Sequence, residues 1–80
     1  MSDVGVLFKV YPENGKEEEI SKRIAELKPS GIQLEDVAFG IKVIKVLFIH
    51  DDKEGSSIFE EKLKQIPGVR EVEVEEESLI

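Results

Sequence analysis

The residues best suited to chemistry lie in one short stretch, His50-Asp51-Asp52-Lys53-Glu54-Gly55. An imidazole beside several carboxylates can bind a metal ion, and histidine is the usual general base. The stretch has a single histidine, however, and its spacing is not that of a calcium-binding loop. The sequence identifies no serine, cysteine or carboxylate as a catalytic partner of His50. We therefore interpret the stretch as a solvated connection, and we expect no catalytic residue, no metal site and no cofactor.

The dipeptide Phe39-Gly40 is the sharpest candidate for a binding site, because it interrupts an apolar stretch that runs from Val37 to Ile49. Glycine tolerates positive φ and therefore suits a change of chain direction. An aromatic residue at such a position either folds back as a lid on the core or projects as an anchor that fills a pocket on a partner. The residues alone leave both interpretations open.

Charged side chains on the predicted strands give weaker candidates. Lys42 and Lys45 are three residues apart and therefore point to opposite faces of a strand, where one of them serves either solubility or binding. We interpret the acidic series as a solvated strand face, with attraction of a basic partner as the alternative. This series is Glu71, Glu73 and Glu75.

Composition restricts the class of protein. Eighty residues suffice for a single modest core, so we expect residues 1–80 to form one domain. The absence of cysteine excludes disulfides and thiolate metal sites, and the net charge of −7 argues against direct binding to nucleic acid. The apolar runs are shorter than a bilayer span, and the start of the chain lacks a signal-peptide pattern. We therefore expect a cytoplasmic protein with no membrane contact.

Four stretches have strand character. The first alternates and ends at Pro12, the second is more polar and is predicted near an edge, and the third is apolar and central. Phe39-Gly40 joins the second to the third as an antiparallel hairpin or a bent continuation. Residues 75–80 are expected to be an acidic tail, whose end, Leu79-Ile80, is either frayed or docked; terminal residues usually fray. The predicted strands are Val4–Tyr11, Ile32–Ala38, Ile41–Ile49 and Val69–Val74.

Two helices are predicted between these strands. Asn14 and Glu17 resemble a capping box that opens a helix reaching about Lys28, and Ser57 and Glu60 resemble a second capping box. The second helix is expected to end before Pro67-Gly68. Each helix has one apolar face with residues three and four apart. These are Ile20, Ile24 and Leu27 in the first helix, and Phe59, Leu63 and Ile66 in the second.

The order of the predicted elements is β-α-β-β-α-β. Val6-Leu7-Phe8 in the first strand recurs as Val46-Leu47-Phe48 in the third, half a chain length later. This order and this recurrence predict an α+β fold of the ferredoxin-like sandwich type, in which two helices cover one face of a four-stranded antiparallel sheet. The other face of the sheet is then open or covered by a partner.

Several segments in order resemble one protein family. Ala38-Phe39-Gly40-Ile41-Lys42, Asp51-Asp52-Lys53, a Gly-Ser opening of the second helix and the closing strand Val69–Val74 are similar to the guanine-nucleotide-exchange domain of translation elongation factor 1-beta, in its stand-alone archaeal form. The resemblance covers about half of the chain. Members of this family have the ferredoxin-like sandwich.

The resemblance implies a non-enzymatic factor that promotes GDP release from elongation factor 1-alpha, which then rebinds GTP during translation elongation. We expect it to be monomeric alone. The family's aromatic at the position of Phe39 inserts beside the nucleotide site of the GTPase, with Gly40 shaping the turn. Lys42, Leu79 and Ile80 complete the expected partner-binding residues. At the position of Leu79, eukaryotic relatives have a lysine that reaches the magnesium site of the GTPase. Lys42 is the residue that we consider as a substitute for this lysine.

Three other functions come into question for this fold, and the sequence disfavours the last two of them. The first alternative is a small-molecule-binding or oligomerisation module, which would form a homodimer with ligands at the interface. An acylphosphatase-like enzyme would need an arginine in a phosphate-binding loop after the first strand, where Pro12-Glu13-Asn14-Gly15 has none. RNA binding on the open face would need basic surroundings for stacking aromatics, and the charge has the wrong sign.

Overall fold

The computed structural model, which describes residues 3–38, 40–53 and 55–80, has two central strands. These strands, β1 (Asp3–Pro12) and β3 (Ile41–Asp51), pair antiparallel along most of their length. The recurring triplets Val6-Leu7-Phe8 and Val46-Leu47-Phe48 lie directly opposite one another in this pairing. Their two phenylalanine rings meet edge to face with centroids 6.0 Å apart. The recurrence in the sequence therefore corresponds to the centre of the sheet.

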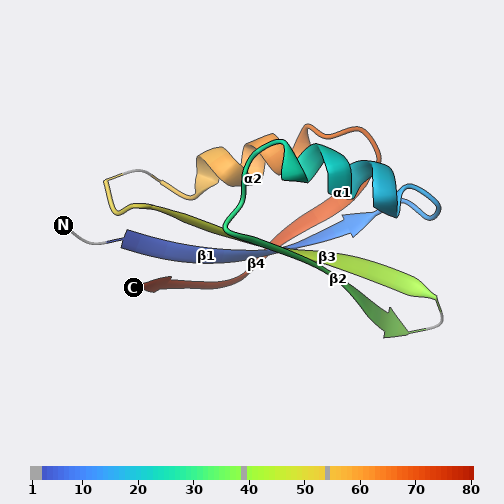
Figure 1. The fold of residues 1–80 in the computed structure, drawn as a ribbon, viewed down its shortest axis with the longest axis horizontal. Helices are drawn as coiled ribbons and strands as arrows, with labels where there is room; N and C mark the ends of the chain where they lie inside the picture. Colours follow the sequence, from blue (N-terminus) through green and yellow to red (C-terminus); the bar gives the residue numbers. More distant parts are fainter. Residues whose placement is uncertain (1–2, 39, 54) are drawn as a thin grey trace.

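The edge strands complete a four-stranded sheet. β2 (Gly31–Ala38) pairs with β3, and β4 (Val69–Leu79) pairs with β1, so the strand order is β2-β3-β1-β4 with all neighbours antiparallel. Both helices, α1 (Glu17–Ala25) and α2 (Ser57–Lys64), cover the same face of the sheet (Figure 1). This arrangement confirms the predicted ferredoxin-like sandwich and places the second strand at an edge, as expected.

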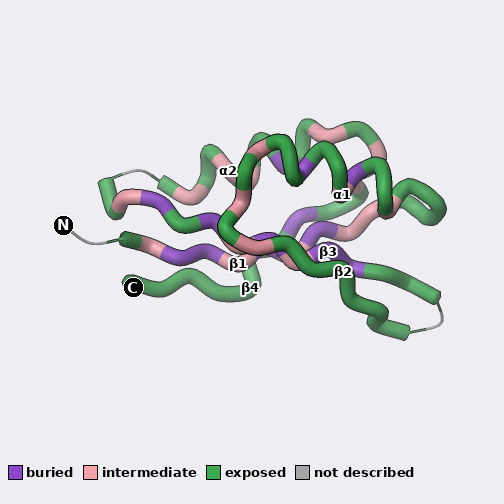
Figure 2. Tube along the Cα trace, viewed as in Figure 1, coloured by how far each residue is buried: buried purple, intermediate pink, exposed green. Residues whose placement is uncertain are grey.

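The core lies between the helices and the inner face of the sheet. Alternate residues of the central strands point toward the helices, which supply Ile20, Ile24 and Leu63 from their predicted apolar faces. Figure 2 shows the buried positions on the central strands and on the sheet-facing side of the helices. The buried cluster consists of Val6, Phe8, Val10, Ile20, Ile24, Ile44, Val46, Phe48, Leu63 and Val72.

The ends of α1 differ from the prediction. Its N-cap is Lys16, without a side-chain cap hydrogen bond among the described residues, so the capping box at Asn14 was wrong. Instead the Glu17 carboxylate accepts a hydrogen bond from the Gly15 N–H at 2.5 Å. The helix ends at Ala25 rather than near Lys28, because Lys28 is in the left-handed region at φ +56° and the following proline disfavours helical backbone there.

The start of α2 also differs from the prediction. Its N-cap is Ser56, and Ser57 is the first helical residue, so the predicted capping box begins one residue too late. The hydroxyl of Ser56 makes no cap hydrogen bond, because it contacts other elements that are described below.

Within the described part of the chain, no helix has the length and apolar content needed to cross a membrane.

β4 is longer than expected, and the prediction of an acidic tail was wrong. The strand continues to Leu79, which lies opposite Val4, and the Ile80 N–H donates to the Asp3 carbonyl oxygen at 2.8 Å. A register shift along β1 leaves Glu75 as the extra residue of a bulge between the paired Val74 and Glu76. The C-terminal residues are therefore docked on the sheet edge rather than frayed.

Candidate functional site

One end of the sheet is formed by the hairpin that joins β2 to β3. Ala38 lies opposite Ile41 in antiparallel pairing, so the hairpin was the right alternative and the bent continuation was not. Gly40 has φ +77°, a conformation that glycine adopts without steric cost. Phe39, the residue between Ala38 and Gly40 in the sequence, lies outside the described residues.

The hairpin end combines exposed apolar side chains with a pocket. Val37 and Ile41 are each 58% exposed, which is high for β-branched residues of a sheet. Ile41 also lines a pocket of about 240 Å³, which is formed by the beginning of β3, the end of β1, the turn after it, the first residue of α1 and one residue of β4. The lining residues are Pro12, Asn14, Glu17, Gly40, Ile41, Lys42 and Arg70.

The pocket contains two cationic side chains from different parts of the chain. Lys42 lies opposite Asp36 in the hairpin, on the same side of β3 as the core residue Ile44. Arg70 is brought there by a register shift between β1 and β4 at Tyr11 and Pro12. Sequence analysis missed Arg70, because only the pairing of β4 with β1 places this residue beside the hairpin.

The opposite end of the sheet is formed by the C-terminus. Leu79 and Ile80 are 71% and 72% exposed. The Ile80 side chain lies against Gly5, where an added Cβ would be only 2.8 Å from Ile80 Cδ1. A second pocket of about 420 Å³ lies beside Leu79, and it is lined by Val4, His50, Asp52, Gly55, Ser56, Glu77, Ser78 and Leu79.

His50 is buried at this end, so its interpretation as part of a solvated connection was wrong. Its Nδ1 donates to the Asp51 carbonyl oxygen at 2.8 Å, and its Nε2 lies 2.9 Å from Ser56 Oγ. Ser56 in turn donates to a carboxylate oxygen of Glu77, and the His50 ring packs on Phe59 with centroids 5.4 Å apart. The serine lies between the histidine and the carboxylate, whereas a catalytic triad requires the histidine in the middle. The contacts therefore connect β3, α2 and β4.

Asp51 and Asp52 interact with one another, and their pKa values are shifted in opposite directions. The Lys53 N–H donates to Asp51 Oδ1 at 2.9 Å, and this hydrogen bond lowers the pKa of the Asp51 carboxyl. The pKa of Asp52 is raised by its hydrogen bond with Asp51, with further contributions from burial and from the charge of Asp51. Across the described residues, no three side chains of the metal-ligating types converge on one point.

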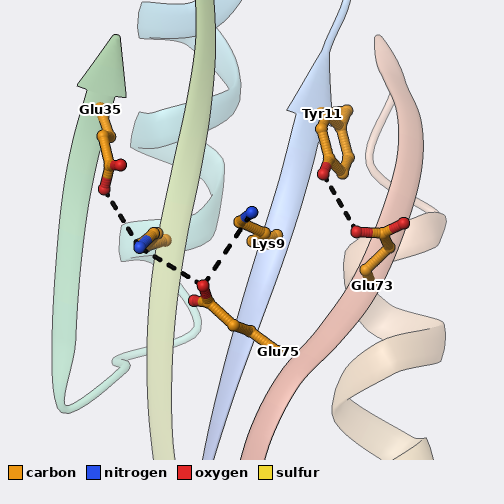
Figure 3. A network of polar contacts seen from close by, with 6 residues as sticks. Lys9, Tyr11, Glu35, Glu73 and Glu75 are labelled. Atoms are coloured by element: carbon orange, nitrogen blue, oxygen red, sulfur yellow. Dashed lines mark hydrogen bonds and ion pairs between the residues drawn. The ribbon is translucent and has the colours of Figure 1, made fainter. Parts of the chain in front are cut away.

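The face of the sheet without helices has a polar network across all four strands (Figure 3). Lys45 Nζ lies 3.2 Å from Glu35 and 3.5 Å from Glu75, whose carboxylate also lies 3.9 Å from Lys9. The Glu35 carboxylate raises the pKa of Lys45. The positive charge of Lys45 is therefore balanced by glutamates of neighbouring strands, which favours a structural role for this residue.

The Tyr11 hydroxyl makes a separate polar contact on the same face of the sheet. It donates to Glu73 Oε2 at 3.0 Å, and this hydrogen bond raises the pKa of Tyr11. Two of the three glutamates in the acidic series of β4, Glu73 and Glu75, are thus engaged by neighbouring strands. They are not simply a solvated acidic face.

The expected partner-binding residues fall into two groups at opposite ends of the molecule (Figure 1). Gly40 and Lys42 lie at the hairpin end, whereas Leu79 and Ile80 lie where β1 begins. Ile41 and Asp51 are the two ends of β3, about 33 Å apart for an extended strand of this length. The longest dimension of the protein is 42 Å. The structure therefore does not bring the two groups together.

Comparison with solved structures supports the fold. The crystal structure of TTHA0845 from Thermus thermophilus matches with a TM-score of 0.58, covering 100% of this chain and 92% of that chain. The two sequences are only 19% identical, so this likeness concerns the fold alone.

Comparison with protein families and curated relatives is more specific. Residues 6–80 match the model of the EF-1 guanine nucleotide exchange domain. Elongation factor 1-beta of Aeropyrum pernix is 39% identical, over 94% of this chain and 93% of the relative. Elongation factor 1-beta of Thermoplasma volcanium is 34% identical over the full length of both. The chain thus belongs to the family of EF-1 guanine nucleotide exchange domains, which act in translation elongation.

Proposed function

We propose that residues 1–80 act as one exchange domain that promotes release of GDP from elongation factor 1-alpha, so that this GTPase can rebind GTP. The observation that supports this most strongly is the family match over residues 6–80. The relatives named elongation factor 1-beta also correspond to nearly the whole of this chain, so the similarity includes both ends of the sheet.

The hairpin end is the proposed wedge. Phe39 would insert beside the nucleotide site of the GTPase, and Gly40 permits the chain reversal next to it. The exposed side chain of Ile41 adds apolar area on the same tip, and Lys42 adds a positive charge. An aromatic anchor surrounded by apolar contacts is the usual form of an energetically dominant interface site.

The C-terminal end is the proposed second contact, with Leu79 and Ile80 as its residues. Leu79 has no charge and therefore cannot compete electrostatically with a magnesium ion as a lysine would. Lys42 lies at the start of β3, whereas Leu79 lies beside Val4, at the opposite end of the sheet. Lys42 would therefore contact a different part of the partner than Leu79 does. We propose that Leu79 makes apolar contacts with the partner, and that the positive charge of Lys42 acts on the partner at the hairpin end.

No covalent chemistry is needed for this function. A protein that binds the displaced arrangement of a nucleotide site better than the closed arrangement lowers the affinity for the nucleotide. A thousandfold faster release requires about 4 kcal/mol of such preference. An anchoring aromatic contributes about 2–4 kcal/mol in protein interfaces. By linkage, a new nucleotide weakens the hold of the factor by the same ratio, which allows the factor to leave.

The test is the release of fluorescent GDP from purified elongation factor 1-alpha of the same source. We expect the wild-type protein to accelerate release, and Phe39→Ala to reduce kcat/KM by about 30-fold or more, the loss typical of a dominant anchor. Ile58→Ala is the matched control for the wedge, because Ile58 is an exposed apolar residue at the start of α2, and this start contacts His50 at the end of β3 that lies opposite the hairpin. It should exchange at the wild-type rate.

Two outcomes would contradict the proposal. If wild type leaves the release rate unchanged over a broad concentration range, the exchange activity is absent. A stable homodimer without affinity for the GTPase would then favour the small-molecule-binding or oligomerisation module. If Phe39→Ala and Ile58→Ala are both as active as wild type, the exchange function remains and the wedge is wrong.

A further inference from the structure

The pocket at the hairpin end has an excess of positive charge. Lys42 and Arg70 line it together, against the single carboxylate of Glu17. One oxygen of that carboxylate already accepts a hydrogen bond from Gly15. A concentration of positive charge is unusual on this chain, whose net charge is −7. The pocket is therefore suited to an anionic group.

These two cations differ from the other cations of the sheet. Lys9 and Lys45, on the opposite face, each form ion pairs with glutamates of neighbouring strands. The ion pairs found among the described residues involve neither Lys42 nor Arg70. Both side chains are exposed. Within the part of the chain that the structure describes, they are thus available to an external anion without breaking an ion pair.

The size and position of the pocket indicate what kind of anion it accepts. Its volume of about 240 Å³ lies below the range of about 300–1,000 Å³ that is typical of small-molecule sites, so a single side chain fits better than a nucleotide. The guanidinium of Arg70 can bind a carboxylate with two parallel hydrogen bonds, and Lys42 adds a point charge. The exposed Ile41 lines the same pocket, so apolar and charged surface adjoin at the hairpin end.

We propose that Lys42 and Arg70 receive an aspartate or glutamate side chain on the surface of the partner GTPase, next to the point where the hairpin tip enters. This inference rests on the proposed function and adds Arg70 to the partner-binding residues. The partner surface that fits is an apolar pocket with an acidic rim. Since charge pairs at an interface accelerate association and fix its register, Arg70 determines how readily and in which orientation the hairpin binds.

The experiment measures GDP release at increasing concentrations of the protein, at low and at moderate salt, for wild type, Arg70→Ala, Arg70→Lys and Lys62→Ala. Lys62→Ala is the matched control, because it removes one positive charge from an exposed position on α2. Thermal unfolding checks that all variants are folded, and Arg70 is exposed, so its loss leaves the core intact.

We expect Arg70→Ala to raise the half-saturating concentration by about 5- to 30-fold, with the maximal rate within about twofold of wild type. Arg70→Lys should raise the half-saturating concentration less than Arg70→Ala does, because lysine keeps the charge but cannot make two parallel hydrogen bonds. The defect of Arg70→Ala should shrink at moderate salt, and Lys62→Ala should behave as wild type.

Equal half-saturating concentrations for Arg70→Ala and Lys62→Ala would overturn the inference, while acceleration by wild type would leave the exchange function in place. A defect in Arg70→Ala that is confined to the maximal rate and insensitive to salt would also overturn it. Failure of wild type to accelerate release would remove the proposed function, and with it the partner that this pocket is inferred to bind.

Discussion

Gly5 shows how a missing side chain positions the end of the chain. It lies on β1 opposite Ser78, and its face is occupied by the side chain of Ile80 rather than by a Cβ of its own. The backbone of Ile80 is held at the same time by its hydrogen bond to Asp3. A terminal residue, which would otherwise fray, is thus fixed by one contact of its side chain and one of its backbone.

We predict that Gly5→Ala releases Ile80. The added Cβ would lie 2.8 Å from Ile80 Cδ1, closer than two carbon atoms can approach, and the end of the chain can move more easily than β1. The Ile80 amide should lose its protection from hydrogen exchange, with a loss of unfolding free energy of at most about 1 kcal/mol. Gly31→Ala is the control, because its Cβ would meet Leu47 at an ordinary 3.7 Å. Unchanged protection in Gly5→Ala would show that Gly5 does not hold the terminus.

At the scale of elements, Ser56 has a role that its neighbour Ser57 lacks. Its hydroxyl contacts the ring of His50 on β3 and the carboxylate of Glu77 on β4, so it connects the start of α2 to two strands. These contacts lie near the C-terminal end of β4, beyond the bulge at Glu75. They therefore help to extend the strand to Leu79.

We predict that Ser56→Ala lowers the free energy of unfolding by about 1–2 kcal/mol. The substitution removes the hydrogen-bond partner of His50 Nε2 and one donor to the Glu77 carboxylate. Ser57→Ala should stay within about 0.5 kcal/mol of wild type, since Ser57 is an exposed first residue of the helix. Urea unfolding of both variants gives the comparison. Equal effects would show that the contacts of Ser56 contribute nothing.

The same elements show what the sequence could predict and what it could not. Strand alternation and helical spacing predicted the element order, the central strands and the helix faces, because burial of one face produces these patterns directly. The predicted start of each helix was wrong, because Lys16 and Ser56 cap the helices without side-chain hydrogen bonds. The bulge at Glu75 breaks the alternation of apolar and acidic residues along β4. The residues after it were therefore predicted to be a tail rather than part of the strand.

The candidate site was predictable only where its residues are neighbours in sequence. Gly40 and Lys42 could be selected from the hairpin segment alone. Arg70 enters the same pocket through strand pairing, and the partners of His50 come from α2 and β4. Contacts between residues distant in the chain leave no local pattern, so the sequence identified His50 as solvated and did not identify Arg70 at all.

At the scale of the whole molecule, the sheet separates two exposed surfaces, one at the start of β3 and one at the end of β4. The start of β3 and the end of β4 are placed at opposite ends of the sheet by the pairing of β3 with β1 and of β1 with β4. The distance between them approaches the 42 Å length of the protein, so one small molecule cannot contact both. Only a macromolecular partner can.

This separation implies that the two ends contribute to binding as independent terms. Residues much more than about 10 Å apart and without shared partners have additive effects, so a double-mutant cycle of Phe39→Ala and Leu79→Ala should give a coupling energy within about 0.5 kcal/mol of zero. The fold losses in kcat/KM would then multiply. A large coupling energy would mean that the partner itself connects the ends, so that loosening it at one surface loosens its hold on the other.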